Sequence, residues 1–190
     1  MKIIKKEHQA IAKWSGGTTR QIYIYPEGSD YASRQFDWRL SSATVDCESS
    51  TFTPLPGVHR HLMILEGKLQ LIHQDHYQVE LAPLEQDQFE GSWHTLSFGK
   101  VIDFNLMLKK GSGKIWGVDG IAPGLLFSQN EITELSSSIH PFFYLHQGEL
   151  GLGEIVLRSG DFITGMDILQ MQVTNASSKL IGVKGGVFIA

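Results

Sequence analysis

The chain has 190 residues, a formal net charge of −4, and 42% hydrophobic and 19% charged residues. No basic stripe is present, which argues against nucleic-acid binding, and no run of roughly 18 apolar residues is present, which argues against a membrane span. Residues 1–7 hold no apolar segment long enough for a signal peptide, and the single cysteine, Cys47, excludes an intramolecular disulfide. These features predict a soluble cytoplasmic protein.

The first part of the chain reads as β-strands with polar faces. Residues 18–25 are rich in β-branched and aromatic side chains, as strands are. Residues 36–45 alternate, so that side chains two apart share a face. One face carries Asp37, Arg39 and Ser41, and the other carries Trp38 and Leu40. A face with this many polar groups indicates either a solvated surface or the wall of a pocket.

Residues 56–67 predict a strand that begins at a Pro-Gly turn and ends at a second glycine. His59 and His61 should share one face, because side chains alternate along a strand. Arg60 should point the other way. Either the histidines or the arginine can therefore line a cavity, but not both, unless a bulge intervenes.

Residues 102–108 form a second informative strand, with Asp103 and Asn105 on one face and apolar side chains on the other. The polar pair could line a pocket or face water. Most of the remaining chain reads as short strands with glycine turns, and residues 129–138 carry too few apolar positions to predict a helix. This pattern predicts an all-β fold of sandwich or barrel type.

An internal repeat divides the chain. Residues 66–71 resemble residues 147–152, and matching positions are 81 residues apart. The repeat predicts two β-barrels that form one compact unit, residues 1–112 carrying the pocket and residues 113–190 a degenerate copy. At the same offset, His59, His61 and Glu66 fall on His140, Phe142 and Gln147. We therefore expect the polar chemistry to reside mainly in the first copy.

Five sequence blocks carry a resemblance to a known family. They are residues 14–19, 36–43, 52–60, 65–67 and 103–107. In order and spacing these blocks resemble the HutD/Ves family of the cupin superfamily. The resemblance implies a bicupin, with two jelly-roll-type barrels packed together, in a bacterial cytoplasm. It also implies a link to histidine utilisation or stress response, a possible homodimer, and no securely established enzymatic activity.

The histidine strand also resembles the first metal-binding motif of cupins. His59, His61 and Glu66 have the corresponding spacing, and His94 could supply a further ligand. The HutD/Ves pattern, in contrast, has an aspartate before the arginine and lacks the second histidine, which implies a pocket without metal. We expect no metal cofactor, with one divalent transition metal as the alternative. His73, His76 and His146 lie near turns and are expected at the surface.

The arginines favour a different chemistry. A guanidinium matches a carboxylate with two parallel hydrogen bonds, so Arg39 and Arg60 are candidate anchors for a small anionic metabolite. The alternative is an internal ion pair of either arginine with Asp37 or Asp103. The sequence thus favours a ligand-binding protein, for example one sensing a formylated glutamate or urocanate, over a metal-dependent isomerase or oxygenase. The candidate ligand-binding residues are Arg39, Ser41, His59, Arg60, His61, Asp103 and Asn105.

Overall fold

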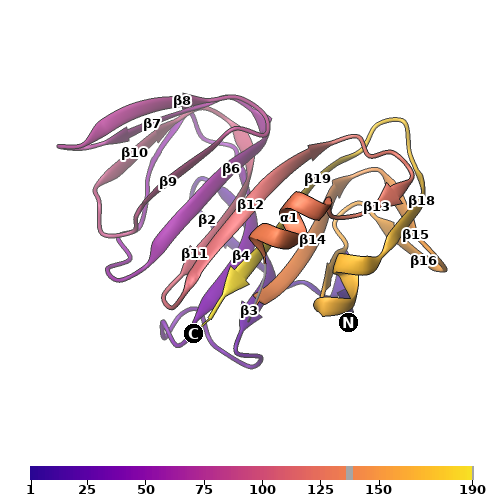
Figure 1. The fold of residues 1–190 in the computed structure, drawn as a ribbon. Helices are drawn as coiled ribbons and strands as arrows, with labels where there is room; N and C mark the ends of the chain where they lie inside the picture. The colour runs from indigo at the N-terminus through magenta and orange to yellow at the C-terminus, as the bar shows by residue number, and fades with distance from the viewer. Residues whose placement is uncertain (136–138, 190) are drawn as a thin grey trace. The chain divides into compact units, whose positions relative to one another are not determined.

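The computed structural model describes residues 1–135 and 139–189, and antiparallel β-strands dominate it (Figure 1). The chain separates into two compact units. The first unit is Gln9–Lys110, and the second consists of Met1–His8 and Gly111–Ala190. The expectation of an all-β fold is confirmed.

The first unit contains a six-stranded and a four-stranded sheet. The six-stranded sheet has the order β2-β3-β4-β11-β6-β9, and the four-stranded sheet has the order β5-β10-β7-β8. The strands are β2 (Ile11–Trp14), β3 (Gly17–Tyr25), β4 (Trp38–Val45), β5 (Ser49–Thr51), β6 (His59–Gly67), β7 (Leu69–His73), β8 (Tyr77–Leu81), β9 (Gln86–Glu90), β10 (Thr95–Phe98) and β11 (Val101–Leu108).

The second unit contains a five-stranded sheet, β1-β17-β14-β19-β12, and a four-stranded sheet, β13-β18-β15-β16. Its strands are β1 (Lys2–Ile4), β12 (Ser112–Asp119), β13 (Gly124–Leu125), β14 (Ile139–Gln147), β15 (Glu149–Leu152), β16 (Ile155–Arg158), β17 (Phe162–Thr164), β18 (Gln172–Ala176) and β19 (Ile181–Phe188). Its helices are α1 (Gln129–Glu134) and the 3₁₀ turns η1 (Lys6–His8) and η2 (Met166–Gln170).

The two units share one topology. The order β4-β11-β6-β9 in the first corresponds to β12-β19-β14-β17 in the second, and β5-β10-β7-β8 corresponds to β13-β18-β15-β16. Even an irregularity recurs: the register of β6 shifts at Leu65, and that of β14 shifts at His146, 81 residues later. Matching bulges at matching positions support the duplication that the sequence repeat predicted.

The interiors of the two units differ in chemistry. Buried leucines, isoleucines and phenylalanines from η2, the strands and the segments that flank α1 pack into one large apolar cluster in the second unit. In the first unit the apolar cluster around Leu62, Leu71 and Phe89 fills only part of the space between the sheets. The remaining part is a cavity whose wall combines apolar side chains with Arg39, Ser41, Arg60, Asp103 and Asn105.

The chain start departs from the predicted boundary, which assigned residues 1–112 to the first barrel. β1 instead pairs with β17, and Lys5 forms a 2.7 Å ion pair with the buried carboxylate of Asp161. Residues 1–8 therefore belong to the second unit. A three-residue strand whose partner lies some 160 positions away leaves no trace in the local sequence pattern.

The short helix α1 was also not predicted. Ser128 and Glu131 form a capping box at its start, and Lys184 forms a 2.8 Å ion pair with Glu131. These polar contacts stabilise a single helical stretch that has little apolar periodicity of its own. Residues 136–138, the end of the segment judged non-helical, lie outside the described residues. No helix among the described residues is long and apolar enough to cross a membrane.

Candidate functional site

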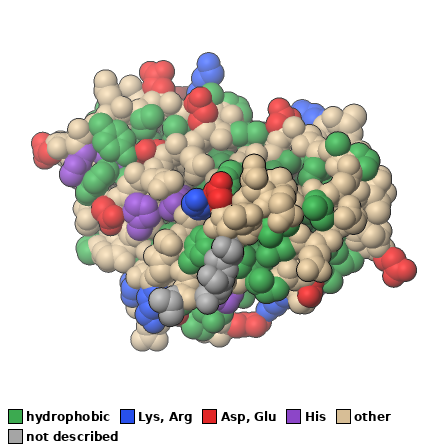
Figure 2. Space-filling view, viewed as in Figure 1, with side chains coloured by type: hydrophobic (Ala, Val, Ile, Leu, Met, Phe, Trp, Pro, Cys, Tyr) green, Lys and Arg blue, Asp and Glu red, His purple; other side chains and the backbone are tan. Residues whose placement is uncertain are grey.

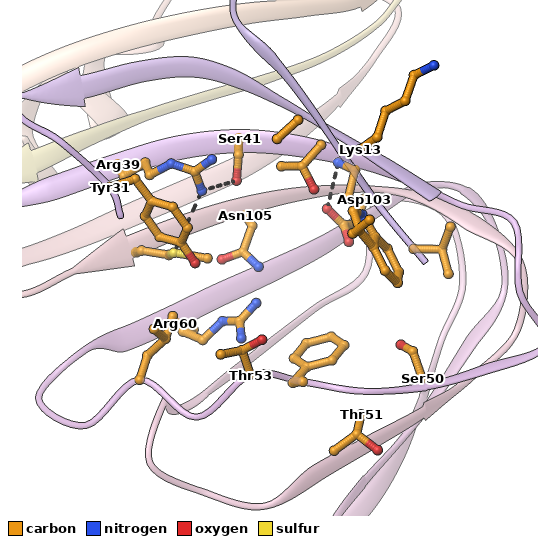
Figure 3. A pocket seen from close by; sticks show the side chains of 18 residues that line it. Lys13, Tyr31, Arg39, Ser41, Ser50, Thr51, Thr53, Arg60, Asp103 and Asn105 are labelled. Atoms are coloured by element: carbon orange, nitrogen blue, oxygen red, sulfur yellow. Dashed lines mark hydrogen bonds between the residues drawn. The ribbon is translucent and has the colours of Figure 1, made fainter. Parts of the chain in front are cut away.

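The first unit contains a cavity of about 330 Å³, a volume at the small end of ligand-binding pockets (Figure 3). Strands β4, β11 and β6 form one wall, and residues 50–55 face them. Five of the seven predicted site residues line it, namely Arg39, Ser41, Arg60, Asp103 and Asn105. Each of the five is between 3% and 7% exposed, so their charges and dipoles lie largely away from bulk water.

The strand register arranges these residues in rows. β11 lies between β4 and β6, so that each inward-facing residue of β11 has one neighbour on either side. The three rows are Arg39–Met107–Arg60, Ser41–Asn105–Leu62 and Ala43–Asp103–Ile64. Adjacent rows are two residues apart, about 7 Å along the strands. The backbone positions of the two arginines therefore share one row, and Asp103 occupies the row at the other end.

Arg39 is held from several sides. Its Nε donates to Gln21 Oε1 at 2.9 Å, and its Nη1 donates to Ser41 Oγ at 3.0 Å. The guanidinium carbon lies 4.1 Å from the centre of the Tyr31 ring, which also contacts Arg34 at 4.7 Å and the Phe36 ring at 5.9 Å. Burial lowers the pKa of Arg39. These contacts fix the group in the cavity wall and provide no carboxylate partner.

Arg60 has fewer polar contacts than Arg39. Its guanidinium carbon lies 4.6 Å from the Phe52 ring centre and 5.3 Å from that of Phe89, and its buried Nε has no hydrogen-bond partner among the described residues. Burial lowers the pKa of Arg60 to about 10, although Asp103 acts in the opposite direction. The described chain thus gives this buried cation aromatic contacts and no carboxylate partner, an arrangement that is costly to the fold.

Two further polar groups are available to a ligand. Asp103 accepts a 3.1 Å hydrogen bond from the Ala43 amide through Oδ1, whereas its Oδ2 has no partner among the described residues. Burial raises the pKa of Asp103 to about 6, although the Ala43 bond and both arginines oppose the shift. The buried Oδ1 of Asn105 is also unpartnered within the described chain. Figure 3 shows the Asn105 amide and the Arg60 guanidinium directed toward each other across open space.

The predicted internal ion pair is not formed. Asp37 pairs with Lys110 at 2.7 Å, outside the cavity, and no described carboxylate lies within ion-pair distance of either arginine. Among the lining residues the charged groups are Arg39, Arg60, Asp103 and Lys13, whose ammonium group points away from the cavity in Figure 3. The cavity is therefore electropositive, with its only carboxyl group at one end.

His59 and His61, both predicted to line the pocket, lie on the opposite face of β6 from Arg60 and are absent from the cavity wall. The alternation of side chains explains the difference. His59 Nδ1 and Glu90 Oε1 are 3.0 Å apart, and the two histidine rings meet edge to face at 5.1 Å. Burial lowers the pKa of His61 to about 4, and the neighbouring His59 makes a smaller contribution in the same direction. Figure 2 shows histidine and acidic side chains at the surface of the first unit.

The candidate metal ligands do not converge. Glu66 is exposed near the end of β6, and His94 is exposed in the β9–β10 turn, where its Nδ1 lies against Gln74 Oε1. Within residues 1–135 and 139–189, no group of three or more His, Cys, Asp or Glu side chains could hold a metal ion. The cupin-like spacing of His59, His61 and Glu66 thus does not bring three candidate ligands together within the described residues.

Sequence reasoning misjudged His73, which was expected at the surface. It is 1% exposed, with Nδ1 2.8 Å from Thr95 Oγ1 and Nε2 2.8 Å from Asp87 Oδ2. Tyr77 donates to the other oxygen of Asp87 at 2.9 Å. This network around the buried His73 ties β7 to β8, β9 and β10, and none of its members lines the cavity.

The reasoning also missed Tyr31, Phe52 and Thr53, which line the cavity from loops. Their sequence neighbourhoods show no strand alternation, so no pattern indicates which way these side chains point. The only available signal was that residues 52–60 belong to the blocks of the family resemblance.

Comparisons with solved structures establish the class of protein. The conserved protein of unknown function PA5104 from Pseudomonas aeruginosa PAO1 matches with a TM-score of 0.71, 19% identity and 98% coverage of both chains. HutD from Pseudomonas fluorescens SBW25 matches with a TM-score of 0.70 and 20% identity, over 100% of this chain and 97% of that chain. The pirin YhhW from Escherichia coli, in complex with nickel(II), matches with a TM-score of 0.66 and 8% identity, over 99% of this chain and 98% of that chain. The fold is that of a bicupin.

The sequence comparison then gives the family. Residues 6–174 match the HutD family, and the chain therefore belongs to that family. A search of curated proteins gave no significant match.

Proposed function

We propose that the first unit binds a small carboxylate metabolite, with Arg39 and Arg60 as the anchors. The observation that carries this proposal is the pair of buried guanidinium groups without a carboxylate partner in the described chain. The structure of HutD from P. fluorescens was obtained in a formate condition, and formate is the smallest carboxylate. A binding protein of this kind would act in the cytoplasm as a regulator of histidine utilisation or of a stress response.

The chemistry of the cavity supports an anion over a cation or a neutral molecule. A carboxylate would form charge-assisted bonds to two guanidinium groups in a site of low dielectric, where such bonds are stronger than in water. It would also relieve the cost of keeping two like charges buried side by side. Asn105 and Ser41, in the adjacent row, would contribute neutral hydrogen bonds.

The proposal is tested by titration calorimetry on purified, dialysed protein. Formate, propionate, glutarate, N-formylglutamate and urocanate serve as anionic probes, and propionamide as the uncharged match to propionate. We expect heat of binding from at least one carboxylate and none from propionamide. Absence of binding by every carboxylate at millimolar concentration would overturn the proposal.

Tyr31 should act as a positioning residue for the bound carboxylate. Its ring contacts the Arg39 guanidinium at 4.1 Å, and such a contact is worth about 0.5–2 kcal/mol. We expect Tyr31→Leu to weaken carboxylate binding roughly 3- to 30-fold, since about 1.4 kcal/mol corresponds to tenfold. Tyr31→Phe retains the ring and should bind within about twofold of wild type. Equal losses in both variants would show that the hydroxyl group, and not the ring, matters.

The alternative of a metal-dependent cupin enzyme has less support, because no group of three or more His, Cys, Asp or Glu side chains that could hold a metal ion occurs within residues 1–135 and 139–189. We expect the purified protein to contain no stoichiometric transition metal, as measured by elemental analysis. About one equivalent of iron, manganese, nickel or zinc that disappears in the double variant His59→Ala/His61→Ala would contradict this expectation.

A further inference from the structure

The end of the cavity opposite the arginines needs its own explanation. In the row farthest from Arg39 and Arg60 lies Asp103, whose neighbours Ala43 and Ile64 are apolar. The carboxyl group is 6% exposed and has no ion-pair partner within the described chain. A buried carboxyl group in this position is costly to the fold, so a purely anionic ligand leaves its presence unexplained.

The hydrogen bonds of Asp103 indicate what would suit it. The Ala43 amide donates to Oδ1, and Oδ2 accepts no hydrogen bond from the described residues in a cavity that Asp103 lines. A carboxylate oxygen only accepts hydrogen bonds, so its natural complement is an N–H or O–H group. Between the two ends, Asn105 presents an unpartnered amide that can both donate and accept.

We propose that the ligand is bifunctional: a carboxylate held by Arg39 and Arg60, and a hydrogen-bond donor, N–H or O–H, that binds Asp103 Oδ2. This inference rests on the proposed carboxylate binding and adds the class of the ligand's second group. Along the cavity wall the polar groups change from cationic, at Arg39 and Arg60, through neutral, at Asn105, to acidic, at Asp103. A ligand with a hydrogen-bond acceptor at one end and a donor at the other matches that order. Monocarboxylates without a donor are then weak ligands.

The burial of Asp103 fits this role. A pKa of about 6 keeps the carboxyl group mostly ionised at pH 7.5, where it accepts hydrogen bonds from a donor. The charged groups that line the cavity with it are Arg39 on β4, Arg60 on β6 and Lys13 on β2. Of these, Arg60 and Arg39 favour the ionised form. At pH 7.5 the site therefore presents an ionised carboxylate that can accept a hydrogen bond from the ligand.

The test compares ligands of equal length with and without a donor. Butyrate, 4-hydroxybutyrate and 4-aminobutyrate, with their three- and five-carbon homologues, are titrated at pH 7.5 into wild-type protein and Asp103→Asn. At the best chain length, we expect wild type to bind the hydroxy or amino acid at least tenfold more tightly than the plain acid. In Asp103→Asn the preference should fall to about threefold or less. The variant should bind butyrate at least as tightly as wild type does, because it has lost a negative charge.

The outcomes separate the two proposals. Binding of plain and donor-bearing acids with equal affinity, unchanged by Asp103→Asn, would overturn the bifunctional ligand and leave the carboxylate site standing. Failure of all these acids to bind wild type, together with failure of the formate, glutarate and urocanate titrations, would overturn both. A donor preference that persists fully in Asp103→Asn would also overturn the assignment of Asp103.

Discussion

Replacing Arg60 by methionine should weaken carboxylate binding roughly 100-fold while the protein remains folded. Two charge-assisted hydrogen bonds to one guanidinium contribute about 3 kcal/mol or more, and about 1.4 kcal/mol corresponds to tenfold in the dissociation constant. The fold should tolerate methionine, because the Arg60 side chain packs against Phe52 and Phe89 and forms no ion pair with the described residues. Replacing a buried charge by an apolar side chain of similar size is often neutral or stabilising.

Two further variants make the result specific. Arg60→Lys and Arg39→Lys retain the charge but lose the planar fork, and should weaken binding by about 1–3 kcal/mol. Arg20→Met is the matched control, since Arg20 is on β3 of the same unit but outside the cavity wall. Calorimetry with the best carboxylate probe measures all four. If Arg39→Lys and Arg60→Lys both bind with wild-type affinity, the arginines are structural.

Replacing Asp103 by asparagine should raise the free energy of unfolding by about 3 kcal/mol at pH 8. The folded-state pKa of about 6 lies above the ordinary aspartate value of 3.8, so the native state binds the proton more tightly than the unfolded state. Each unit of difference is about 1.4 kcal/mol. The penalty from Asp103 is fully present above about pH 6 and diminishes as the pH falls toward 4. Asparagine retains an oxygen for the Ala43 amide and removes the charge.

Urea unfolding from pH 4 to pH 8, followed by tryptophan fluorescence, measures this effect. The difference between Asp103→Asn and wild type should increase from near zero at pH 4 to its maximum at pH 8. Asp75→Asn, in an exposed turn of the same unit, serves as the control and should show no such trend. A variant that is less stable than wild type at pH 8 would show that the carboxylate is compensated in the native state.

Stability and binding thus oppose each other at this cavity. Arg60 and Asp103 are both charged groups whose burial is unfavourable for folding, and the variants that relieve that cost are those expected to impair ligand recognition. Such opposition is common at functional sites, where groups are kept for a partner that is absent during folding. The filled apolar interior of the second unit, which has the same topology, shows what this barrel contains without such groups.

The sequence was most informative about side chains on regular strands, where the alternation of polar and apolar residues shows which side chains share a face. Alternation placed Arg39 with Ser41, and Asp103 with Asn105, on shared faces, and all four line the cavity. The same alternation rule placed Arg60 on one face of the strand and His59 and His61 on the other. It could not decide whether the arginine or the histidines line the cavity. That choice depends on the register of β6 against β11, which long-range pairing sets.

Other parts of the site could not be predicted from local pattern. His73 is the last residue of β7 and precedes a turn, yet Asp87 and Thr95, from two later strands, form hydrogen bonds that enclose it. Tyr31 and Phe52 reach the cavity from loops, where neither helical nor strand periodicity constrains a side chain. The pairing of β1 with β17 likewise depends on contacts distant in sequence.

The most direct test of the account is a crystal structure of the protein grown with the carboxylate that binds best in calorimetry. The account predicts the carboxylate in the cavity of the first unit, with its oxygens about 2.7–2.9 Å from guanidinium nitrogens of Arg39 and Arg60, the usual length of such charge-assisted bonds. A carboxylate bound elsewhere on the molecule, with both guanidinium groups untouched by ligand, would contradict it.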